Sequence, residues 1–298
     1  MGWRKRLWAW LCWLPLVGCA ANEFPEPIPA GAERFAGYAV GYLTPATLER
    51  DGVERSYWVY LPAGYDASQP LPLVVNLHAY NAAGPKQEQI SRMRPLADVH
   101  GFILVYPEAR GEPAAWDFTP GLAANADTQF IAALLDQLAG QLAVDQDRQF
   151  VMGLSNGGGM AHRLACDLGD RFRAAAMVAG VYPAGSPCAA TTPIPILAFH
   201  GDADSVVPYA GGGANNLLPV SDWATAWAER NDCQDQTEEV TPSYRHTRWT
   251  NCSSATSVQL YTLTTWDHFW PDPANVPEDM ADPGVNASEL IWTFFAGE

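Results

Sequence analysis

The feature that most restricts the fold is a serine set between glycines, where an apolar run meets a segment of small residues. The stretch reads Gln149-Phe-Val-Met-Gly-Leu-Ser-Asn-Gly-Gly-Gly159 and places Ser155 in a G-x-S-x-G motif. In this motif a strand turns so sharply into a helix that the serine is strained at the apex, and only small residues two positions away avoid a backbone clash. The apolar run 150–152 predicts the strand, and residues 160–165 predict the helix. The alternative is a glycine-rich turn that carries an idle serine.

Two later strand ends carry residues that could work with this serine. A serine hydroxyl is a weak nucleophile, so catalysis requires a histidine base, an acid that orients it and donors for an oxyanion. The apolar run 194–199 leads into a loop that holds Asp202 and Asp204. The run 258–263 leads into a loop that holds His268. The order serine, acid, histidine resembles that of α/β-hydrolases, not that of chymotrypsin or subtilisin.

Strands and helices alternate along the chain, which predicts one doubly wound, mostly parallel sheet with helices on both faces. The 298 residues, of which 48% are hydrophobic, suffice for a single domain over residues 35–298. We expect strands at 54–62, 71–78, 102–107, 150–152, 174–181, 194–199 and 258–263. We expect helices at 87–100, 127–142, 160–165, 220–230 and 287–295.

The N-terminal residues 1–18 have the pattern of an export signal. A basic start precedes the apolar run 7–17, which is too short to span a membrane. The run ends in Leu16-Val-Gly-Cys19, which resembles the lipobox of bacterial lipoproteins and predicts lipidation of Cys19. An ordinary cleaved signal is the alternative. We therefore expect an exported protein, secreted or lipid-anchored at the cell envelope, and at the outer membrane if the cell is Gram-negative.

The proline-rich residues 19–34 predict a flexible tether between anchor and domain. The membrane would then be a partner only through the lipid on Cys19. The net charge of −16 repels phosphate backbones, so we expect no nucleic-acid partner. We expect a monomer.

With Cys12 removed in the signal and Cys19 modified, an even number of cysteines remains, as expected in an oxidising compartment. They are Cys166, Cys188, Cys233 and Cys252. Three pairings are possible. We favour Cys166 with Cys188 and Cys233 with Cys252, because each closes a loop of about twenty residues and contributes roughly 3 kcal/mol by loop entropy. Neither C-x-x-C nor paired histidines at ligand spacing occur, so no metal site is predicted.

With these motifs in place, the sequence resembles the secreted esterases grouped with polyhydroxybutyrate depolymerases and with feruloyl or acetylxylan esterases (carbohydrate esterase family 1). The motifs are Pro70-Leu-Pro-Leu-Val-Val-Asn-Leu-His78, Phe102-Ile-Leu-Val-Tyr-Pro-Glu108, Val144-Asp-Gln-Asp-Arg148, His200-Gly-Asp-Ala-Asp204 and His268-Phe-Trp-Pro271. The resemblance implies the α/β-hydrolase fold and a triad of Ser155, Asp204 and His268 without a cofactor. It favours Asp204 over Asp202 because the acid of this group stands four positions after the histidine of His200-Gly201.

The expected oxyanion donors are the backbone N–H of Asn156 and that of Tyr80 or Ala79. The aromatic residues Tyr80, Trp116 and Trp270 are candidates for lining a substrate pocket. The alternative for the two tryptophans is a place in the core.

The sequence departs from the resembling esterases at two positions beside the expected site. These esterases usually have glycine directly after the histidine of the oxyanion strand and just before the catalytic histidine. Here Ala79 and Asp267 hold those places, and Trp266 precedes the second. Both changes are expected to add bulk beside the acyl site.

These observations predict an exported serine carboxylic-ester hydrolase that works through an acyl-enzyme. Its expected substrates are small or oligomeric plant-wall-type esters, feruloyl or acetylxylan, or related short acyl esters. One alternative is a poly(3-hydroxybutyrate) depolymerase or oligomer hydrolase. Others are an acyltransferase or peptidase with the same triad, and a non-catalytic cell-surface binding lipoprotein.

Overall fold

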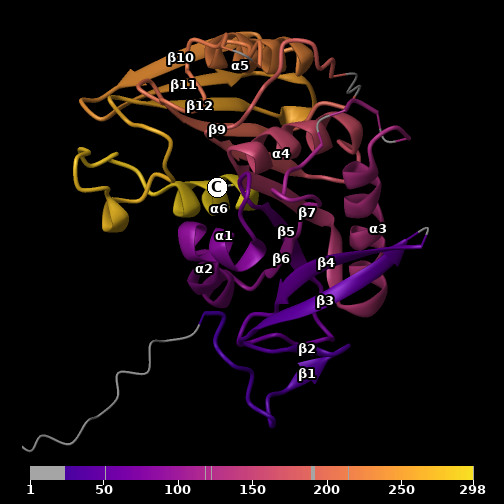
Figure 1. The fold of residues 1–298 in the computed structure, drawn as a ribbon. Coiled ribbons are helices and arrows are strands. Elements are labelled where there is room, and N and C mark those ends of the chain that lie inside the picture. Colours follow the sequence, from indigo (N-terminus) through magenta and orange to yellow (C-terminus); the bar gives the residue numbers. More distant parts are fainter. Residues whose placement is uncertain are drawn as a thin grey trace, which may run out of the picture.

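The computed structural model describes residues 24–297 except 51, 118, 122, 189–191 and 214. The expected signal peptide 1–18 and the expected lipidation site Cys19 lie outside the described residues. The described chain folds around one ten-stranded sheet with helices on both faces (Figure 1). The predicted α/β-hydrolase fold class is therefore confirmed.

The large sheet has the strand order β10-β11-β12-β9-β8-β7-β5-β6-β4-β3. Its strands are β3 (Leu43–Arg50), β4 (Val53–Tyr60), β5 (Leu71–Leu77), β6 (Ile103–Pro107), β7 (Val144–Leu154), β8 (Ala174–Val178), β9 (Ile196–Gly201), β10 (Asp235–Val240), β11 (Tyr244–Thr250) and β12 (Val258–Leu263). Neighbouring strands from β12 to β6 run parallel, and the two ends of the sheet are antiparallel. A separate short ribbon consists of β1 (Arg34–Phe35) and β2 (Tyr38–Ala39).

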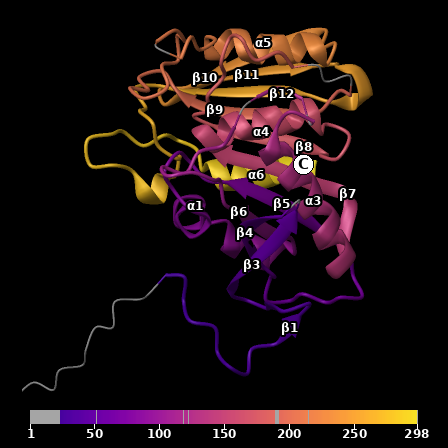
Figure 2. The ribbon, with the colours of Figure 1, turned by 45° about the vertical axis from the view of Figure 1, so that its right-hand side comes forward.

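The helices form a layer on each face of the sheet (Figures 1 and 2). They are α1 (Gly84–Ser91), α2 (Met93–His100), α3 (Ala126–Gln141), α4 (Asn156–Asp167), α5 (Val220–Arg230) and α6 (Ala287–Ala296), with short 3-10 turns η1 (Ser253–Ala255) and η2 (Pro273–Asn275). Apolar side chains of α3, α4 and α5 pack with one face of the central strands. Those of α2 and α6 pack with the other face. None of the described helices is long and apolar enough to cross a membrane.

The central strands agree with the apolar runs of the sequence, because parallel strands covered on both faces are apolar throughout. Every residue of β6, β8 and β9 is buried. The expected strand at 258–263 coincides with β12, and the expected helix at 287–295 coincides with α6 to within one residue. The Asn286 side chain caps α6 by accepting from two backbone N–H groups.

Two local expectations were wrong. The helix expected over 87–100 is broken into α1 and α2, because Arg92 adopts the left-handed conformation with φ 49°. In the large sheet no strand was expected at β3, β10 or β11, whereas β10 and β11 extend the sheet beyond β12 and β3 forms its opposite edge. All residues of β10 are exposed, so this edge strand lacks the apolar alternation by which a strand is read from sequence.

Part of the expected tether, residues 24–34, lies within the described chain, and its start contacts the domain. A Glu26 carboxylate oxygen lies 2.5 Å from Nη1 of Arg94, and the guanidinium of Arg94 lies 5.1 Å from the ring centre of Phe24. The segment is thus in contact with α2 at Phe24 and Glu26. A tether of the expected kind stays a prediction for residues 19–23.

Both favoured disulfides are present. Cys166, near the end of α4, is joined to Cys188, and Cys233, after α5, is joined to Cys252. Each bridge therefore fixes a loop to the end of a helix that packs on the same face of the sheet.

Candidate active site

The elbow around Ser155 has the strained geometry that its motif predicts. Ser155 lies between the end of β7 and the start of α4 with φ 57° and ψ −116°. A positive φ is costly for a residue other than glycine and is held only where the surroundings enforce it. Here the Ser155 N–H donates to the carbonyl of Val178 on the neighbouring strand at 2.8 Å. The elbow is thus pinned to β8, and Ser155 is only 7% exposed.

The glycines of the motif are required by close backbone contacts. A Cβ on Gly153 would lie 2.4 Å from the carbonyl oxygen of Gly157. A Cβ on Gly157 would lie 2.3 Å from the carbonyl oxygen of Leu77, at the end of β5. Both distances are far below a normal carbon–oxygen contact, and neither neighbour is a side chain that could move away. The turn therefore fits only because these positions lack a side chain.

The structure joins the expected acid and the expected histidine. His268 Nδ1 lies 2.7 Å from Asp204 Oδ2. The two residues follow β12 and β9, which are adjacent and parallel. A neutral imidazole that donates from Nδ1 keeps Nε2 as its basic nitrogen. The arrangement therefore gives His268 the tautomer that a general base for serine needs.

Asp204 is held as a buried carboxylate by several donors. Its Oδ1 accepts from the backbone N–H groups of Val206 at 2.9 Å and Val207 at 2.7 Å. Its Oδ2 lies 3.3 Å from His200 Nε2, which also donates to the Val207 carbonyl at 2.8 Å. Burial alone would raise the pKa of Asp204, but the hydrogen bonds from His200, His268 and Val207 hold this pKa well below its usual range. Asp202 lacks this environment, because among the described residues its Oδ1 accepts only from the backbone N–H of Thr265.

The three predicted triad residues share one edge of the sheet. Strands β7, β9 and β12 belong to one parallel run, so the loops that carry Ser155, Asp204 and His268 leave it on the same side. The carboxyl ends of parallel strands are where α/β sheets bind their ligands. In the part of the chain that the structure describes, Ser155 Oγ makes no hydrogen bond to His268. Serine–histidine bonds are often long in free enzymes and tighten when substrate binds.

The expected oxyanion donors have no protein acceptor in the described chain. Asn156 is the first residue of α4, where backbone N–H groups have no partner within the helix. The N–H of Tyr80 likewise donates to no backbone carbonyl among the described residues. The Tyr80 loop lies close to this helix end, because the carbonyls of Leu77 and His78 lie within 2.6 Å of where a Gly157 Cβ would be. Two free donors are therefore available at the elbow.

The two expected tryptophans are core residues. Trp116 is 3% exposed, and its indole N–H donates to the His78 carbonyl at 3.0 Å. Trp270 is 5% exposed, and its indole N–H donates to Ser288 Oγ on α6 at 3.0 Å. Little of either ring is left for a ligand. The ring of Tyr80 differs, because it is 56% exposed.

Sequence reasoning missed two apolar side chains beside the expected triad. Val206 and Phe269 are exposed, as is Tyr80. Val206 stands two residues after Asp204, and Phe269 directly follows His268. The sequence did contain a signal for them: one large apolar residue stands in the loop that carries the acid, and another stands in the loop that carries the base. These two residues and Tyr80 lie in loops that leave the same edge of the sheet as the triad, and the three form what we call the apolar rim.

The Asp267 side chain, which was expected to add bulk beside the acyl site, contacts the neighbouring loop that carries Asp204. Asp267 Oδ1 accepts from the N–H of Ser205 at 2.7 Å and from the N–H of His268 at 2.8 Å. Trp266 is buried, and its indole N–H donates to the Phe269 carbonyl at 3.1 Å. The departure at Asp267 thus joins the acid loop to the histidine loop.

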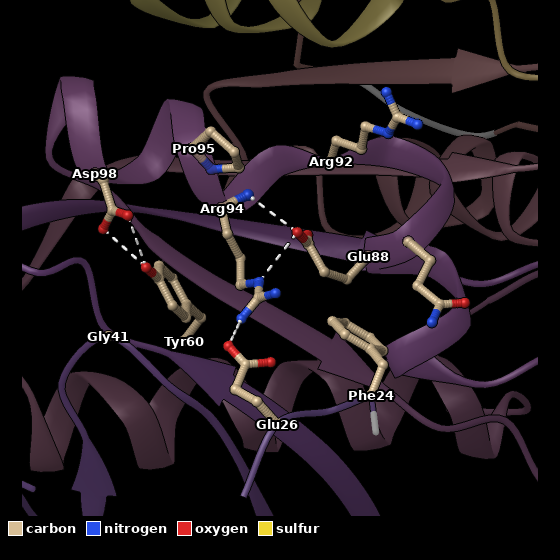
Figure 3. A pocket seen from close by; sticks show the side chains of 10 residues that line it. Phe24, Glu26, Gly41, Tyr60, Glu88, Arg92, Arg94, Pro95 and Asp98 are labelled. Atoms are coloured by element: carbon tan, nitrogen blue, oxygen red, sulfur yellow. Dashed lines mark hydrogen bonds and ion pairs between the residues drawn. The ribbon is translucent and has the colours of Figure 1, made fainter. Parts of the chain in front are cut away.

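A pocket of about 530 Å³ lies away from these residues, against α1, α2 and β4. Figure 3 shows Arg94 at its centre, bonded to Glu88 on one side and to Glu26 on the other. Burial raises the pKa of Glu88, although Tyr106 and Arg94 hydrogen-bond to its carboxylate. None of the expected site residues lines this pocket. Among the described residues, no group of histidines, cysteines and carboxylates is arranged to hold a metal ion.

Comparison with known proteins identifies the family. Residues 55–207, just over half of the chain, match the family described as Esterase PHB depolymerase. The chain belongs to this esterase family. The matched segment includes Ser155 and Asp204 and ends before His268.

Curated relatives of this chain are named as esterases. Feruloyl esterase B of Piromyces equi is 27% identical over 227 residues, which cover 72% of this chain and 42% of that protein. Feruloyl esterase C of Emericella nidulans is 34% identical over 163 residues, which cover 53% of this chain and 58% of that protein. The aligned part of the chain thus spans less than two thirds of the length of either relative.

The solved structure of an acetyl xylan esterase from Aspergillus awamori supports the same fold. It superposes with a TM-score of 0.65 over 85% of this chain and 99% of that one. The sequences are only 17% identical. This likeness establishes the architecture.

Proposed function

We propose that the protein is a serine carboxylic-ester hydrolase that uses Ser155, His268 and Asp204. The observation that carries the proposal is the 2.7 Å bond between His268 and Asp204, on loops that leave the same edge of the sheet as the strained serine of an esterase-family elbow. A carboxylate that fixes the imidazole at Nδ1 orients the ring and stabilises the imidazolium that forms during catalysis.

In the proposed reaction Ser155 Oγ attacks the ester carbonyl carbon while His268 Nε2 takes the hydroxyl proton. The carbonyl oxygen becomes an oxyanion, which the N–H groups of Asn156 and Tyr80 stabilise. The tetrahedral intermediate then collapses: the bond to the alkoxy oxygen breaks, and His268 gives its proton to the departing alcohol. Water attacks the acyl-enzyme with His268 again as base, and the acid leaves as Ser155 regains its proton.

For the substrate we propose small or oligomeric esters with a planar or apolar group, such as feruloyl esters or acetylated xylan fragments. The apolar rim supports this, because exposed apolar side chains beside a catalytic centre can contact an aryl or acyl group. The names of the feruloyl esterase relatives point the same way. The family description favours the second candidate, a hydroxybutyrate oligomer or polymer.

A substrate panel separates the two candidates. Methyl ferulate, acetylated xylo-oligosaccharide, p-nitrophenyl acetate and hydroxybutyrate oligomers are compared by kcat/KM, which reports differential transition-state binding. We expect methyl ferulate or the acetylated oligosaccharide to lead. A lead of more than about tenfold for hydroxybutyrate oligomers, or about 1.4 kcal/mol, would establish the depolymerase instead. Addition of an alcohol acceptor distinguishes hydrolysis from acyl transfer by the products formed.

We also propose that the protein is exported and held at the cell envelope by a lipid on Cys19. Two disulfides support export, because such bonds form and persist in oxidising compartments. Replacing Cys19 with alanine is expected to move the protein from the membrane fraction to the soluble fraction. Equal partitioning of the wild type and the variant would show that Cys19 is not an anchor.

A further inference from the structure

The loop that carries Asp204, the acid loop, and the loop that carries His268, the histidine loop, are joined by carboxylates. Each loop extends an aspartate side chain to the main chain of the other. From the acid loop, Asp202 Oδ1 accepts from the N–H of Thr265 at 2.6 Å. From the histidine loop, Asp267 Oδ1 accepts from the N–H and the hydroxyl of Ser205 at 2.7 and 2.8 Å. The same oxygen accepts from the N–H of His268 at 2.8 Å. Besides the bond between Asp204 and His268, each loop therefore supplies one carboxylate and receives one.

Main-chain contacts fix the base of the same two loops. The Asp202 N–H donates to the Leu263 carbonyl at 2.9 Å, and the Ala203 N–H donates to the Trp266 carbonyl at 3.2 Å. A Cβ on Gly201 would lie 1.9 Å from the Trp266 carbonyl oxygen, so the two backbones are in direct contact there. The bond from Thr265 to Asp202 lies among these main-chain contacts, and the bond from Ser205 to Asp267 lies beyond them.

We propose that Asp202 and Asp267 are positioning residues that set the distance and orientation of His268 relative to Asp204. Ser205 follows Asp204, and Asp267 precedes His268, so the bond between Ser205 and Asp267 spans the same gap as the bond between the acid and the base. The bond from Asp267 to the N–H of His268 also fixes the main chain from which the imidazole extends. A displacement of about 1 Å in such a constellation can cost about a hundredfold in rate.

The Asp267 carboxylate is suited to this role. Hydrogen bonds from the N–H and hydroxyl of Ser205 hold its pKa below the usual range, so it stays an ionised acceptor. Its oxygens are engaged by donors of the protein itself, with Oδ2 also accepting from the Ser205 hydroxyl at 3.0 Å. Glycine, the usual residue of the resembling esterases at this position, has no side chain to form such a bond. The hydrogen bonds by which Asp267 joins the two loops are therefore a feature of this chain. The inference extends the proposed function and rests on it.

The test compares Asp267→Ala, Asp267→Asn and Asp202→Ala in the full chain, with p-nitrophenyl acetate as substrate. We expect Asp267→Ala to lower kcat by about ten- to a hundredfold with KM within about twofold. Asp267→Asn keeps an acceptor oxygen at the same place and should recover most of the loss. Asp66→Ala is the matched control, because Asp66 is an exposed aspartate that accepts from the Ser68 N–H at 2.8 Å far from the triad in sequence. It should leave kcat unchanged.

A double-mutant cycle that combines Asp267→Ala with His268→Ala distinguishes positioning of the histidine from a general structural role of Asp267. If Asp267 acts through the histidine, adding Asp267→Ala to His268→Ala should lower the residual rate no further. An equal loss in both backgrounds, or wild-type kcat in Asp267→Ala, would overturn the inference. If Asp267→Ala does not fold, Ser205→Ala removes only the hydroxyl donor and should lower kcat by about two- to tenfold. Full activity of His268→Ala would instead overturn the proposed function, and this inference with it.

Discussion

The nucleophile and its two partners are held in place by different kinds of contact. At the elbow, main-chain atoms touch main-chain atoms, and Gly157 leaves no room for even one added carbon. In the acid and histidine loops, side-chain hydrogen bonds join segments that are 64 residues apart at Asp204 and His268. The turn that carries the serine is thus encoded by a local motif of five residues, although main-chain contacts with β5 and β8 hold it in place. The position of the base is encoded by contacts between distant segments.

The largest expected effect concerns Asp204. It tests whether side-chain hydrogen bonds between the acid and histidine loops hold the base in place. Asp204→Asn removes the carboxylate that accepts from His268 Nδ1, so the imidazole is held in the wrong tautomer. We expect kcat to fall by about 10⁴-fold, with little change in folding. Kinetics with p-nitrophenyl acetate measure the loss.

Asp202→Asn is the matched control for this variant. Asp202 accepts from the Thr265 N–H and is the other carboxylate of the same loop. Like Asp267→Asn, this variant keeps an acceptor oxygen for the Thr265 N–H, so kcat should fall far less than in Asp204→Asn. The reverse ranking of the two variants would assign the acid to Asp202.

The second prediction concerns Gly157. It tests whether close main-chain contacts hold the elbow in place. In Gly157→Ala the new methyl group would lie 2.3 Å from the Leu77 carbonyl oxygen, which belongs to a central strand. Overpacking of a core usually costs about 1–3 kcal/mol, and a clash between main chains should exceed that range. We expect a large loss of the free energy of unfolding in urea, or no folded protein.

Gly140→Ala provides the comparison for this helix position. Gly140 lies in α3, and a Cβ there would meet nothing within 4 Å. The substitution should leave stability unchanged or raise it by about 0.5–1 kcal/mol, because alanine favours the helix. Equal stability of both variants would show that the elbow tolerates side chains.

The smallest expected effect concerns His162, which lies buried on the elbow helix α4. Its Nδ1 accepts from the indole N–H groups of Trp223 at 3.3 Å and Trp227 at 3.2 Å. Burial, aided by nearby Arg163 and Arg230, lowers the pKa of His162 to about 3. The unfolded chain binds this proton near pH 6.5, so the free energy of unfolding should fall as the pH drops from about 6.5 to about 3.

Unfolding curves in urea between these pH values measure the slope. His162→Gln keeps an acceptor for the two indoles and does not titrate, so its stability should vary less over this window. His100→Gln, at the exposed end of α2, serves as the control and should retain the wild-type slope. A wild-type slope in His162→Gln would assign the pH dependence to other groups.

Much of the fold could be predicted because its signals are local. The elbow, the buried parallel strands and the capped start of α6 each depend on residues within a short window. The two disulfides also followed from sequence proximity, because each closes a short loop.

The features that could not be predicted depend on contacts between residues that are far apart in the sequence. Trp116 and Trp270 are as aromatic as Tyr80, but only their packing and indole hydrogen bonds show that they belong to the core. Asp267 was expected to crowd the acyl site, whereas its carboxylate accepts from Ser205 on another loop. Tertiary hydrogen bonds of this kind cannot be read from composition or periodicity.

The most direct test of the central claim is covalent labelling with a fluorophosphonate probe, followed by peptide mapping. The probe reacts with a serine only when a base activates it. We expect one adduct, on Ser155, that is absent in Ser155→Ala and forms far more slowly in His268→Ala. An unlabelled wild type would favour the non-catalytic binding lipoprotein, and an adduct on another serine would contradict the assignment of Ser155 as the nucleophile.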